Sequence, residues 1–254
     1  GVVGKTPEFG FLTEEGRKGK WLVEVKTKKL PNAQILGSAI GMKVIEEVPY
    51  IVGLDKLFSG MKKDQINDYL KDMGAATASN GAVGLYHVEG VTPEAVDAGK
   101  KLLAEGYKTY VIDEKELERV YDSYPMIWKD VNASPKLCFI GCPQLSISQL
   151  HDWTNKISDK LKSENREKVK IRTILCAAPD VIEKFKKDQA AYNKLMATGA
   201  KLTYICPLMY MNNPLCSKKP VITNSNKLRT YTTSRFFTDD EILKKIVEGG
   251  RSSR

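Results

Sequence analysis

The chain has 254 residues, of which 42% are hydrophobic and 28% charged, and its formal net charge at pH 7 is +9. These values are typical of a globular protein, and no apolar run reaches the roughly 18 residues of a membrane helix, so no membrane-spanning helix is expected in this sequence. The five cysteines lack the spacing of a disulfide framework and no signal peptide opens the chain, which favours a reducing, cytoplasmic location.

The excess of positive charge has three interpretations. The commonest is a solvated, lysine-rich surface, and the second is attraction of a small anionic substrate. Nucleic acid is the third, but the lysines are scattered among acids, without interleaved aromatic residues or a nucleic-acid motif. We therefore expect neither a nucleic-acid partner nor a membrane partner.

The first half of the chain alternates predicted strands with predicted helices. Strands are expected at residues 21–25, 49–52, 83–88 and 108–112. Helices are expected from Lys62, from Thr92 as N-cap with Pro93 in the first turn, and from Asp113 as N-cap. Residues 36–44 and 75–81 are small and indicate closely packed backbone. The opening Gly-Val-Val-Gly, which lacks methionine, predicts that the natural chain continues upstream.

Residues 123–135 contain two prolines and are the candidate linker between two lobes. We expect a first lobe over residues 1–124 and a second over residues 125–254. Because strands alternate with helices throughout, the predicted fold class is α/β, with mostly parallel sheets in three-layer βα units.

The second half repeats one pattern, a strand that ends at a cysteine. Residues 137–140 form an apolar strand that Gly141 is expected to break, with Pro143 in the first turn of a helix that carries Ile147, Leu150 and Trp153. Further strands are expected at 169–175 and 202–205, followed by Cys176 and Cys206, and Asp180 is expected to cap the helix after the first of them. A strand at 221–223, a helix from residue 224 and a last helix at 239–247 complete the pattern.

Cys142, Cys176 and Cys206 therefore follow three strands at equivalent positions. Because the carboxyl ends of parallel strands meet along one crevice, we expect these three thiols to lie together. The alternative for any one of them is core packing, since free cysteine is a small, often buried side chain. Cys138 lies inside its strand and is predicted to be core, and Cys216 is predicted to lie in a loop.

The residue types limit the chemistry. His87 is expected in a strand and His151 on a helix, both structural, so a serine–histidine triad or a histidine-rich zinc site is disfavoured. Three separated thiolates suit iron–sulfur or zinc binding, and an open metal position can act as a Lewis acid on a substrate oxygen. Loss or addition of water at a hydroxy acid is the reaction that this suggests.

The segment 223–227, Thr-Asn-Ser-Asn-Lys, follows a strand and opens a helix. Hydroxyls, backbone N–H groups and a cation there suit a carboxylate or phosphate, and an ordinary helix cap is the alternative.

Four segments in this order give the chain a family resemblance. They are residues 4–10, residues 79–83 with His87 and 90–95, residues 141–146 (Gly-Cys-Pro-Gln-Leu-Ser), and residues 223–227. Together they resemble the catalytic large subunit of the aconitase X family, which includes phosphomevalonate dehydratase and cis-3-hydroxy-L-proline dehydratase.

The resemblance implies an aconitase-like fold, an iron–sulfur cluster held by three cysteines and a small swivelling domain as partner. Cys142 and Cys206 match family ligands, the third of which belongs to an upstream motif, and Cys176 is a neighbour or a substitute. Gln144 departs from the family, which usually has histidine there.

The expected activity is removal of water from a small anionic hydroxy acid, 5-phosphomevalonate first and a hydroxyproline second. Asn224, Ser225 and Lys227 would bind the anionic group with Ser79 lining the same crevice, and Ser225 and Lys227 are also the catalytic candidates. The rival expectation is a catalytically silent binding subunit.

Overall fold

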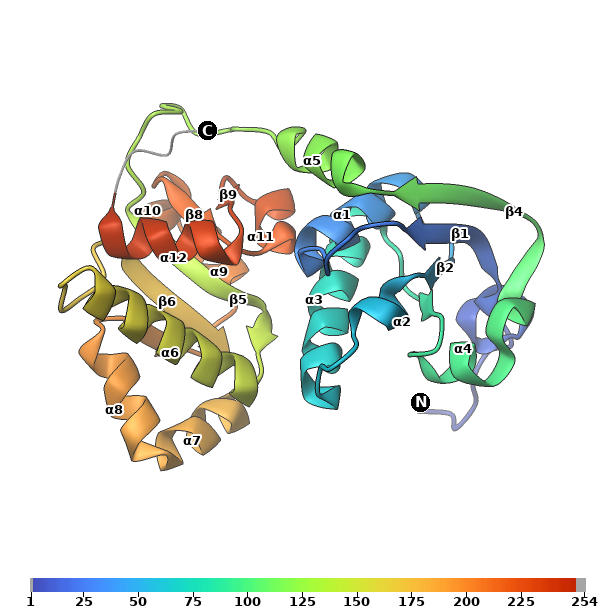
Figure 1. The fold of residues 1–254 in the computed structure, drawn as a ribbon, viewed down its shortest axis with the longest axis horizontal. Helices are drawn as coiled ribbons and strands as arrows, with labels where there is room; N and C mark the ends of the chain where they lie inside the picture. The colour runs from blue at the N-terminus through green and yellow to red at the C-terminus, as the bar shows by residue number, and fades with distance from the viewer. Residues whose placement is uncertain (1, 250–254) are drawn as a thin grey trace. The chain divides into compact units, whose positions relative to one another are not determined.

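The computed structural model describes residues 2–249 and divides the chain into two compact units, each built on one parallel sheet (Figure 1). Unit 1 comprises Gly1–Ile66 and Asp72–Ser123, and unit 2 comprises Asn67–Lys71 and Tyr124–Arg254. Every pairing between neighbouring strands is parallel within the described residues, which confirms the predicted α/β class.

The sheet of unit 1 has four strands in the order β3-β2-β1-β4. The strands are β1 (Gly19–Val25), β2 (Pro49–Val52), β3 (His87–Val88) and β4 (Leu103–Ile112). The helices are α1 (Ala33–Val44), α2 (Leu54–Leu57), α3 (Lys63–Gly81), α4 (Pro93–Ala98) and α5 (Glu114–Asp122). Single 3₁₀ turns occupy Gly10–Leu12, Glu15–Arg17 and Gly99–Leu102.

Small residues set the packing of α1 on α3, as the sequence predicted. A Cβ on Gly37 would lie 2.3 Å from the carbonyl oxygen of Met73, and one on Gly41 would lie 2.6 Å from that of Thr77. The predicted helix starts at Thr92 and Asp113 are also confirmed. The strand predicted over residues 83–88 is wrong in length, because only His87 and Val88 pair with β2.

The sheet of unit 2 has five strands in the order β7-β6-β5-β8-β9. The strands are β5 (Leu137–Leu145), β6 (Arg172–Ala177), β7 (Lys201–Thr203), β8 (Val221–Thr223) and β9 (Arg235–Phe236). The helices are α6 (Ile147–Ser163), α7 (Pro179–Lys187), α8 (Gln189–Ala197), α9 (Pro207–Met211), α10 (Pro214–Ser217), α11 (Asn226–Tyr231) and α12 (Asp239–Glu248).

Helices cover both faces of this sheet, which gives unit 2 three layers. Successive residues of β5 point to opposite faces, so Cys138 and Ile140 pack with α6, α7, α8 and α12. Leu137 and Phe139 pack on the other side with α9 and α11. The predicted apolar face of α6 is confirmed at Leu150 and Trp153, which are buried in the first of these clusters, but is wrong at Ile147, which is exposed.

The structure corrects the prediction around Gly141. The strand does not break there but continues as β5 to Leu145, and Pro143 lies in it rather than in a helix. The register with β6 shifts between Ile140 and Leu145, so the irregular residues remain within the strand. The helix begins only after Ser146, whose side chain caps it.

Other boundaries differ by a few residues. β6 begins at Arg172 instead of 169, and Ala178 rather than Asp180 is the N-cap of α7, because Pro179 already occupies the first helical position. β7 ends at Thr203, α11 begins two residues later than predicted, and Cys216 lies in the short helix α10 instead of a loop.

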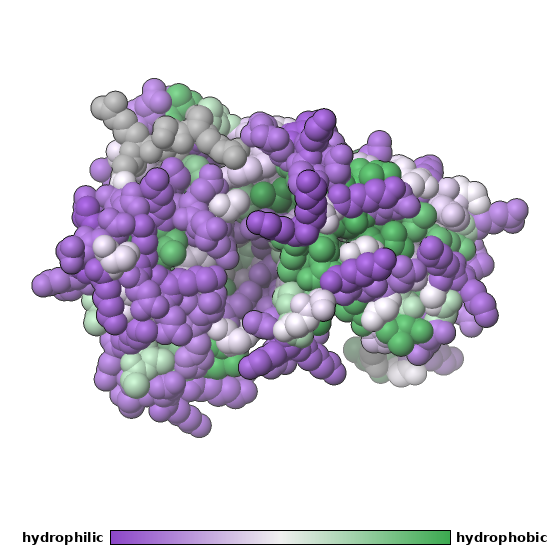
Figure 2. All heavy atoms as spheres, in the orientation of Figure 1, coloured by the Kyte–Doolittle hydropathy of each residue, from purple (hydrophilic) through white to green (hydrophobic). Residues whose placement is uncertain are grey.

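The surface gives no sign of a membrane span. Among the described residues no helix has both the length and the apolar character to cross a bilayer. Figure 2 shows mostly hydrophilic residues over the face of unit 2 that carries α6 and α12.

Candidate functional site

The three cysteines predicted to converge all lie at the carboxyl side of neighbouring strands in unit 2. Cys142 lies in the last part of β5 and Cys176 in the last part of β6, and both are buried. Cys206 follows β7 and is the N-cap residue of α9, with an exposed side chain. Cys138 is fully buried, which confirms its prediction as a core residue.

The three thiols are close enough to affect one another's ionisation. Burial raises the pKa of Cys142 and the neighbouring Cys206 raises it further, while a hydrogen bond from Ser225 and the charge of Lys227 lower it. Burial raises the pKa of Cys176 to about 11, a hydrogen bond from Gln144 lowers it, and both other cysteines raise it. A cation or metal at this place would reverse the balance by favouring the thiolates.

The backbone approaches closely where the first two cysteines meet. Gly141 has φ +100°, and a Cβ there would lie 2.3 Å from the carbonyl oxygen of Cys176 and 2.9 Å from Cγ of Leu145. Glycine is therefore required at this position for two reasons, its left-handed conformation and the missing side chain.

Gln144 connects the three strand ends. Its Nε2 donates to the carbonyl oxygen of Tyr204 at 3.4 Å and lies 4.0 Å from Sγ of Cys176. The Cys176 thiol in turn donates to the carbonyl oxygen of Ile205 at 3.5 Å. Gln144 thus has contacts that tie β5 to the segment before Cys206.

The segment 223–227 lies beside Cys142. The Ser225 hydroxyl oxygen accepts from the backbone N–H of Leu228 at 3.1 Å, and the backbone N–H of Ser225 donates to Thr223 Oγ1 at 3.1 Å. Ser225 therefore caps α11, and both Ser225 and the positive charge of Lys227 lower the pKa of Cys142. This geometry is compatible with an ordinary helix cap and with an anion-binding segment.

Two partners of this segment were not found from the sequence. Asn224 Nδ2 donates to Oδ1 of Asp239 at 2.8 Å, and burial raises the pKa of that carboxyl, although the bond from Asn224 opposes the shift. Asn226 Nδ2 donates to the hydroxyl of Tyr124 at 2.7 Å. No local signal marks either partner, because both lie far from the segment in sequence.

The remaining predicted residues lie elsewhere. Ser79 is in α3, where its hydroxyl donates to the carbonyl oxygen of Ala76 at 3.2 Å, and its role in the cysteine crevice stays a prediction. His87 is buried, with Nε2 2.8 Å from the Arg17 carbonyl oxygen, and the ring of His151 packs edge-on against Phe185. Both histidines are structural, as expected.

The side chains at the cysteine site determine whether a metal ion or an iron–sulfur cluster fits there. Within residues 2–249 no three Cys, His, Asp or Glu side chains are arranged to hold a metal ion. The donor chemistry nevertheless suits iron or an iron–sulfur cluster, since Cys142, Cys176 and Cys206 supply soft sulfur donors at the ends of three neighbouring strands. Cys142 and Cys206 have no carbonyl partner in the described structure, whereas the Cys176 thiol is held by Ile205.

Comparisons with known proteins agree with the architecture. Models of the aconitase X second domain and third domain match residues 19–122 and 135–241. The structure of Thermococcus kodakaraensis aconitase X in its holo form aligns with a TM-score of 0.74 and 24% identity, covering 96% of this chain and 59% of that one. This likeness supports the α/β fold alone.

Curated relatives include large subunits of phosphomevalonate dehydratase. The large subunit of Methanocaldococcus jannaschii is 28% identical over 97% of this chain and 58% of its own length. The large subunit of Thermococcus kodakarensis is 31% identical over 59% of this chain and 36% of its own length. The cis-3-hydroxy-L-proline dehydratase of Hypocrea jecorina is 27% identical over 59% of this chain and 25% of its own. The chain spans at most 58% of the length of these curated relatives.

Proposed function

Because this chain belongs to the aconitase X family, we propose that it is the catalytic part of a hydro-lyase that removes water from a small anionic hydroxy acid. The substrate proposed first is 5-phosphomevalonate, which agrees with the names of the relatives matched over most of the chain and with the net charge of +9. The alternative substrate is cis-3-hydroxy-L-proline, after the more distant relative.

One observation carries the proposal, the junction of a thiol site with a cationic, hydroxyl-bearing loop. Cys142 belongs to the same core cluster as Leu228 of α11, the helix that Ser225 caps, and Ser225 and Lys227 both lower the pKa of this thiol. An anion that Lys227 attracts would therefore lie beside the thiols. A dehydratase needs this combination, one group that holds the substrate's charge and another that withdraws its hydroxyl.

The proposed cofactor is an iron–sulfur cluster, which supplies a Lewis acid for the departing hydroxyl when bound. Cys142 and Cys206 are the proposed ligands in this chain. Cys176 is proposed as their neighbour, because its thiol is already engaged by Ile205 and approached by Gln144.

The chain's own residues are proposed to bind and orient the substrate. Lys227 would pair with the anionic group of the substrate. Because Asp239 fixes the Asn224 amide through Nδ2, the carbonyl oxygen of Asn224 would be held in one direction as an acceptor for the substrate. Ser225 lowers the pKa of Cys142 and so would favour the thiolate form of that ligand. A small swivelling subunit is the proposed partner, as the name "large subunit" of the relatives supports, and the cytoplasm the proposed location.

The second candidate function is a catalytically silent binding subunit. It is favoured by one observation, the glutamine at position 144 where the family usually has histidine, since the Gln144 amide makes contacts with the strand ends but cannot transfer a proton at neutral pH.

Anaerobic purification with a small-subunit partner tests the proposal. We expect a brown, iron-containing complex that dehydrates 5-phosphomevalonate, and loss of both colour and activity in Cys142→Ala. Cys138→Ala is the matched control, because it removes a thiol of the same strand that faces the core.

Two results would argue against the enzyme. A colourless, iron-free complex would support the silent subunit. Equal loss of iron in the Cys138→Ala and Cys142→Ala variants would show that the colour reflects folding of β5 and not ligation.

A further inference from the structure

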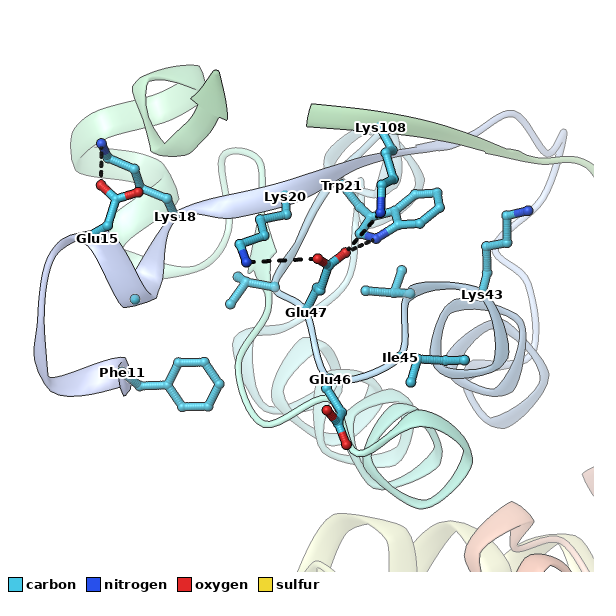
Figure 3. Close-up of a pocket in the computed structure, with 13 residues that line it drawn as sticks. Phe11, Glu15, Lys18, Lys20, Trp21, Lys43, Ile45, Glu46, Glu47 and Lys108 are labelled. Atoms are coloured by element: carbon cyan, nitrogen blue, oxygen red, sulfur yellow. Dashed lines mark hydrogen bonds and ion pairs between the residues drawn. The ribbon is translucent and has the colours of Figure 1, made fainter. Parts of the chain in front are cut away.

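Two of the cavities in the described structure are lined by several cations but differ in how the charge is balanced. The one in unit 1 has a volume of about 770 Å³. Figure 3 shows Glu47 directed toward Lys20, Lys108 and Trp21, with separations of 3.8, 3.6 and 2.6 Å. Lys18 pairs with Glu15 at 2.8 Å. The carboxylates in the lining therefore neutralise most of the positive charge of this cavity.

A smaller cavity in unit 2, of about 310 Å³, has no acidic residue in its lining. It is formed by Lys136, Leu137, Arg172, Ile174, Tyr210, Cys216 and Lys219. Three of these seven residues are cations, and their side chains are exposed at the rim. We call this the unit 2 basic pocket.

In the described part of the chain, the three cations of the unit 2 basic pocket have no carboxylate partner. Within residues 2–249, neither Lys136, Arg172 nor Lys219 forms an ion pair with a carboxylate. Like charges gathered at the rim of a concave site raise the local concentration of anions. A bound anion would therefore reduce the repulsion among these three cations, which no carboxylate of the described chain pairs with.

The floor of the pocket is apolar. Leu137 is 4% and Ile174 5% exposed, and both belong to the core cluster on this face of the sheet. The Tyr210 ring packs on Phe139 with centroids 5.3 Å apart, and its hydroxyl is 3.2 Å from Thr203 Oγ1. A ligand there meets hydrocarbon below and cations above.

The unit 2 basic pocket and the cysteine site lie toward opposite ends of β5 and β6, on one core cluster that contains Leu137, Ile174 and Cys142. Leu137 and Arg172 are the first residues of β5 and β6 and pair with each other. Cys142 and Cys176 lie toward the other ends of the same strands. The two sites therefore lie at the amino ends and at the carboxyl ends of the strands of one parallel sheet.

We propose that the unit 2 basic pocket binds a small phosphate monoester with a short apolar group. Three positive charges match a phosphate dianion better than a carboxylate, and arginine binds phosphate oxygens through two parallel hydrogen bonds. The volume lies at the lower end for ligand pockets, which fits only a small ester. This site is independent of the proposed dehydratase activity.

The half-buried thiol of Cys216 lines the pocket and reports on its occupancy. The experiment measures alkylation of Cys216 in the full chain by peptide mass spectrometry during titration with n-butyl phosphate, with 1-butanol as the neutral counterpart. We expect saturable protection by n-butyl phosphate and none by 1-butanol, a comparison that needs no variant.

Charge variants then locate the site. Arg172→Gln and Lys219→Gln should each weaken protection by about tenfold or more, the effect of losing a hydrogen bond to a charged group. Lys218→Gln is the matched control, because it makes the same change one residue away at a side chain that lines a different cavity.

The proposal is overturned if n-butyl phosphate gives no saturable protection, or if 1-butanol protects equally, which would indicate a purely apolar cavity. It is also overturned if Lys218→Gln weakens binding as much as Lys219→Gln, because the attraction would then be a diffuse surface field. Arg172→Lys, which keeps the charge, replaces Arg172→Gln if that variant does not fold.

Discussion

Replacement of Gly141 by alanine tests whether the close approach of β5 to Cys176 holds the cysteine site together. The new methyl group would lie 2.3 Å from the Cys176 carbonyl oxygen, a backbone atom that cannot rotate away. A left-handed conformation costs alanine about 1–2 kcal/mol, and overpacking adds about 1–3 kcal/mol. We expect Gly141→Ala to lower the free energy of unfolding by about 2–5 kcal/mol in total.

Gly199→Ala separates the two effects. Gly199 is also in unit 2 and has φ +81°, but a Cβ there meets only the Lys168 side chain, at 3.5 Å, an ordinary contact. Only the conformational cost of about 1–2 kcal/mol should remain. The difference between the two variants therefore measures the steric overlap with the strand that carries Cys176.

The assay is urea unfolding followed by tryptophan fluorescence in a Trp21→Phe background, so that Trp128 and Trp153 of unit 2 give the signal. Alkylation of Cys142 in the native state is the second measurement, and it should be faster in Gly141→Ala because the strands must separate. Equal destabilisation by the two variants, within about 0.5 kcal/mol, would refute the argument from close approach.

Three further changes have defined outcomes. Leu150→Ala, at a fully buried side chain of α6, should cost about 2–5 kcal/mol in urea unfolding, whereas Ile147→Ala, 37% exposed, should cost under about 1 kcal/mol, and similar losses would contradict the assigned face. Ser225→Ala removes a helix cap worth about 1 kcal/mol and the side chain that lowers the pKa of Cys142. The pH dependence of Cys142 alkylation should therefore shift to higher pH in Ser225→Ala but not in Ser163→Ala. An unchanged pH dependence in Ser225→Ala would contradict the effect of Ser225 on Cys142. The hydrogen bond from Arg17 holds the pKa of Glu94 below its ordinary value, so this contribution exists above the unfolded carboxyl pKa and disappears as pH falls. Glu94→Gln should therefore cost up to about 0.5 kcal/mol at neutral pH and nothing in acid, and a loss that persists at about pH 3 would contradict the ion pair.

Short-range patterns predicted much of the fold. The strands Pro49–Val52 and Val221–Thr223 match their predictions to the residue, because each is an apolar run between turn residues. The cap at Asp113 was found because its side chain acts locally, accepting from the N–H of Glu116. The end of β5 was missed, since Leu145 is kept in the strand by pairing with Ala177, a contact that no local pattern contains.

The candidate site, like the fold, could be predicted from the sequence only in part. The strand pattern predicted that Cys142, Cys176 and Cys206 follow neighbouring strands, and the structure places them there, whereas a shared metal site for the three thiols stays a prediction. The side chains that orient the loop at Ser225 could not be predicted, because Tyr124 and Asp239 reach it only through tertiary packing. Gln144 was noticed as a departure from the family, but its bonds to two other strand ends depend on the same packing.

The strand order of unit 2 has a consequence for how this unit can assemble. β5 is its central strand, and its two neighbours come from residues 172–177 and 221–223, which are synthesised well after it. Until both have arrived, the row of N–H and C=O groups on at least one side of β5 lacks its native partner strand, next to a run of strongly apolar side chains. Long-range parallel pairing of this kind closes slowly, so the nascent chain passes through a period in which its middle strand is a template for aggregation, and a truncation before β8 would make that exposure permanent.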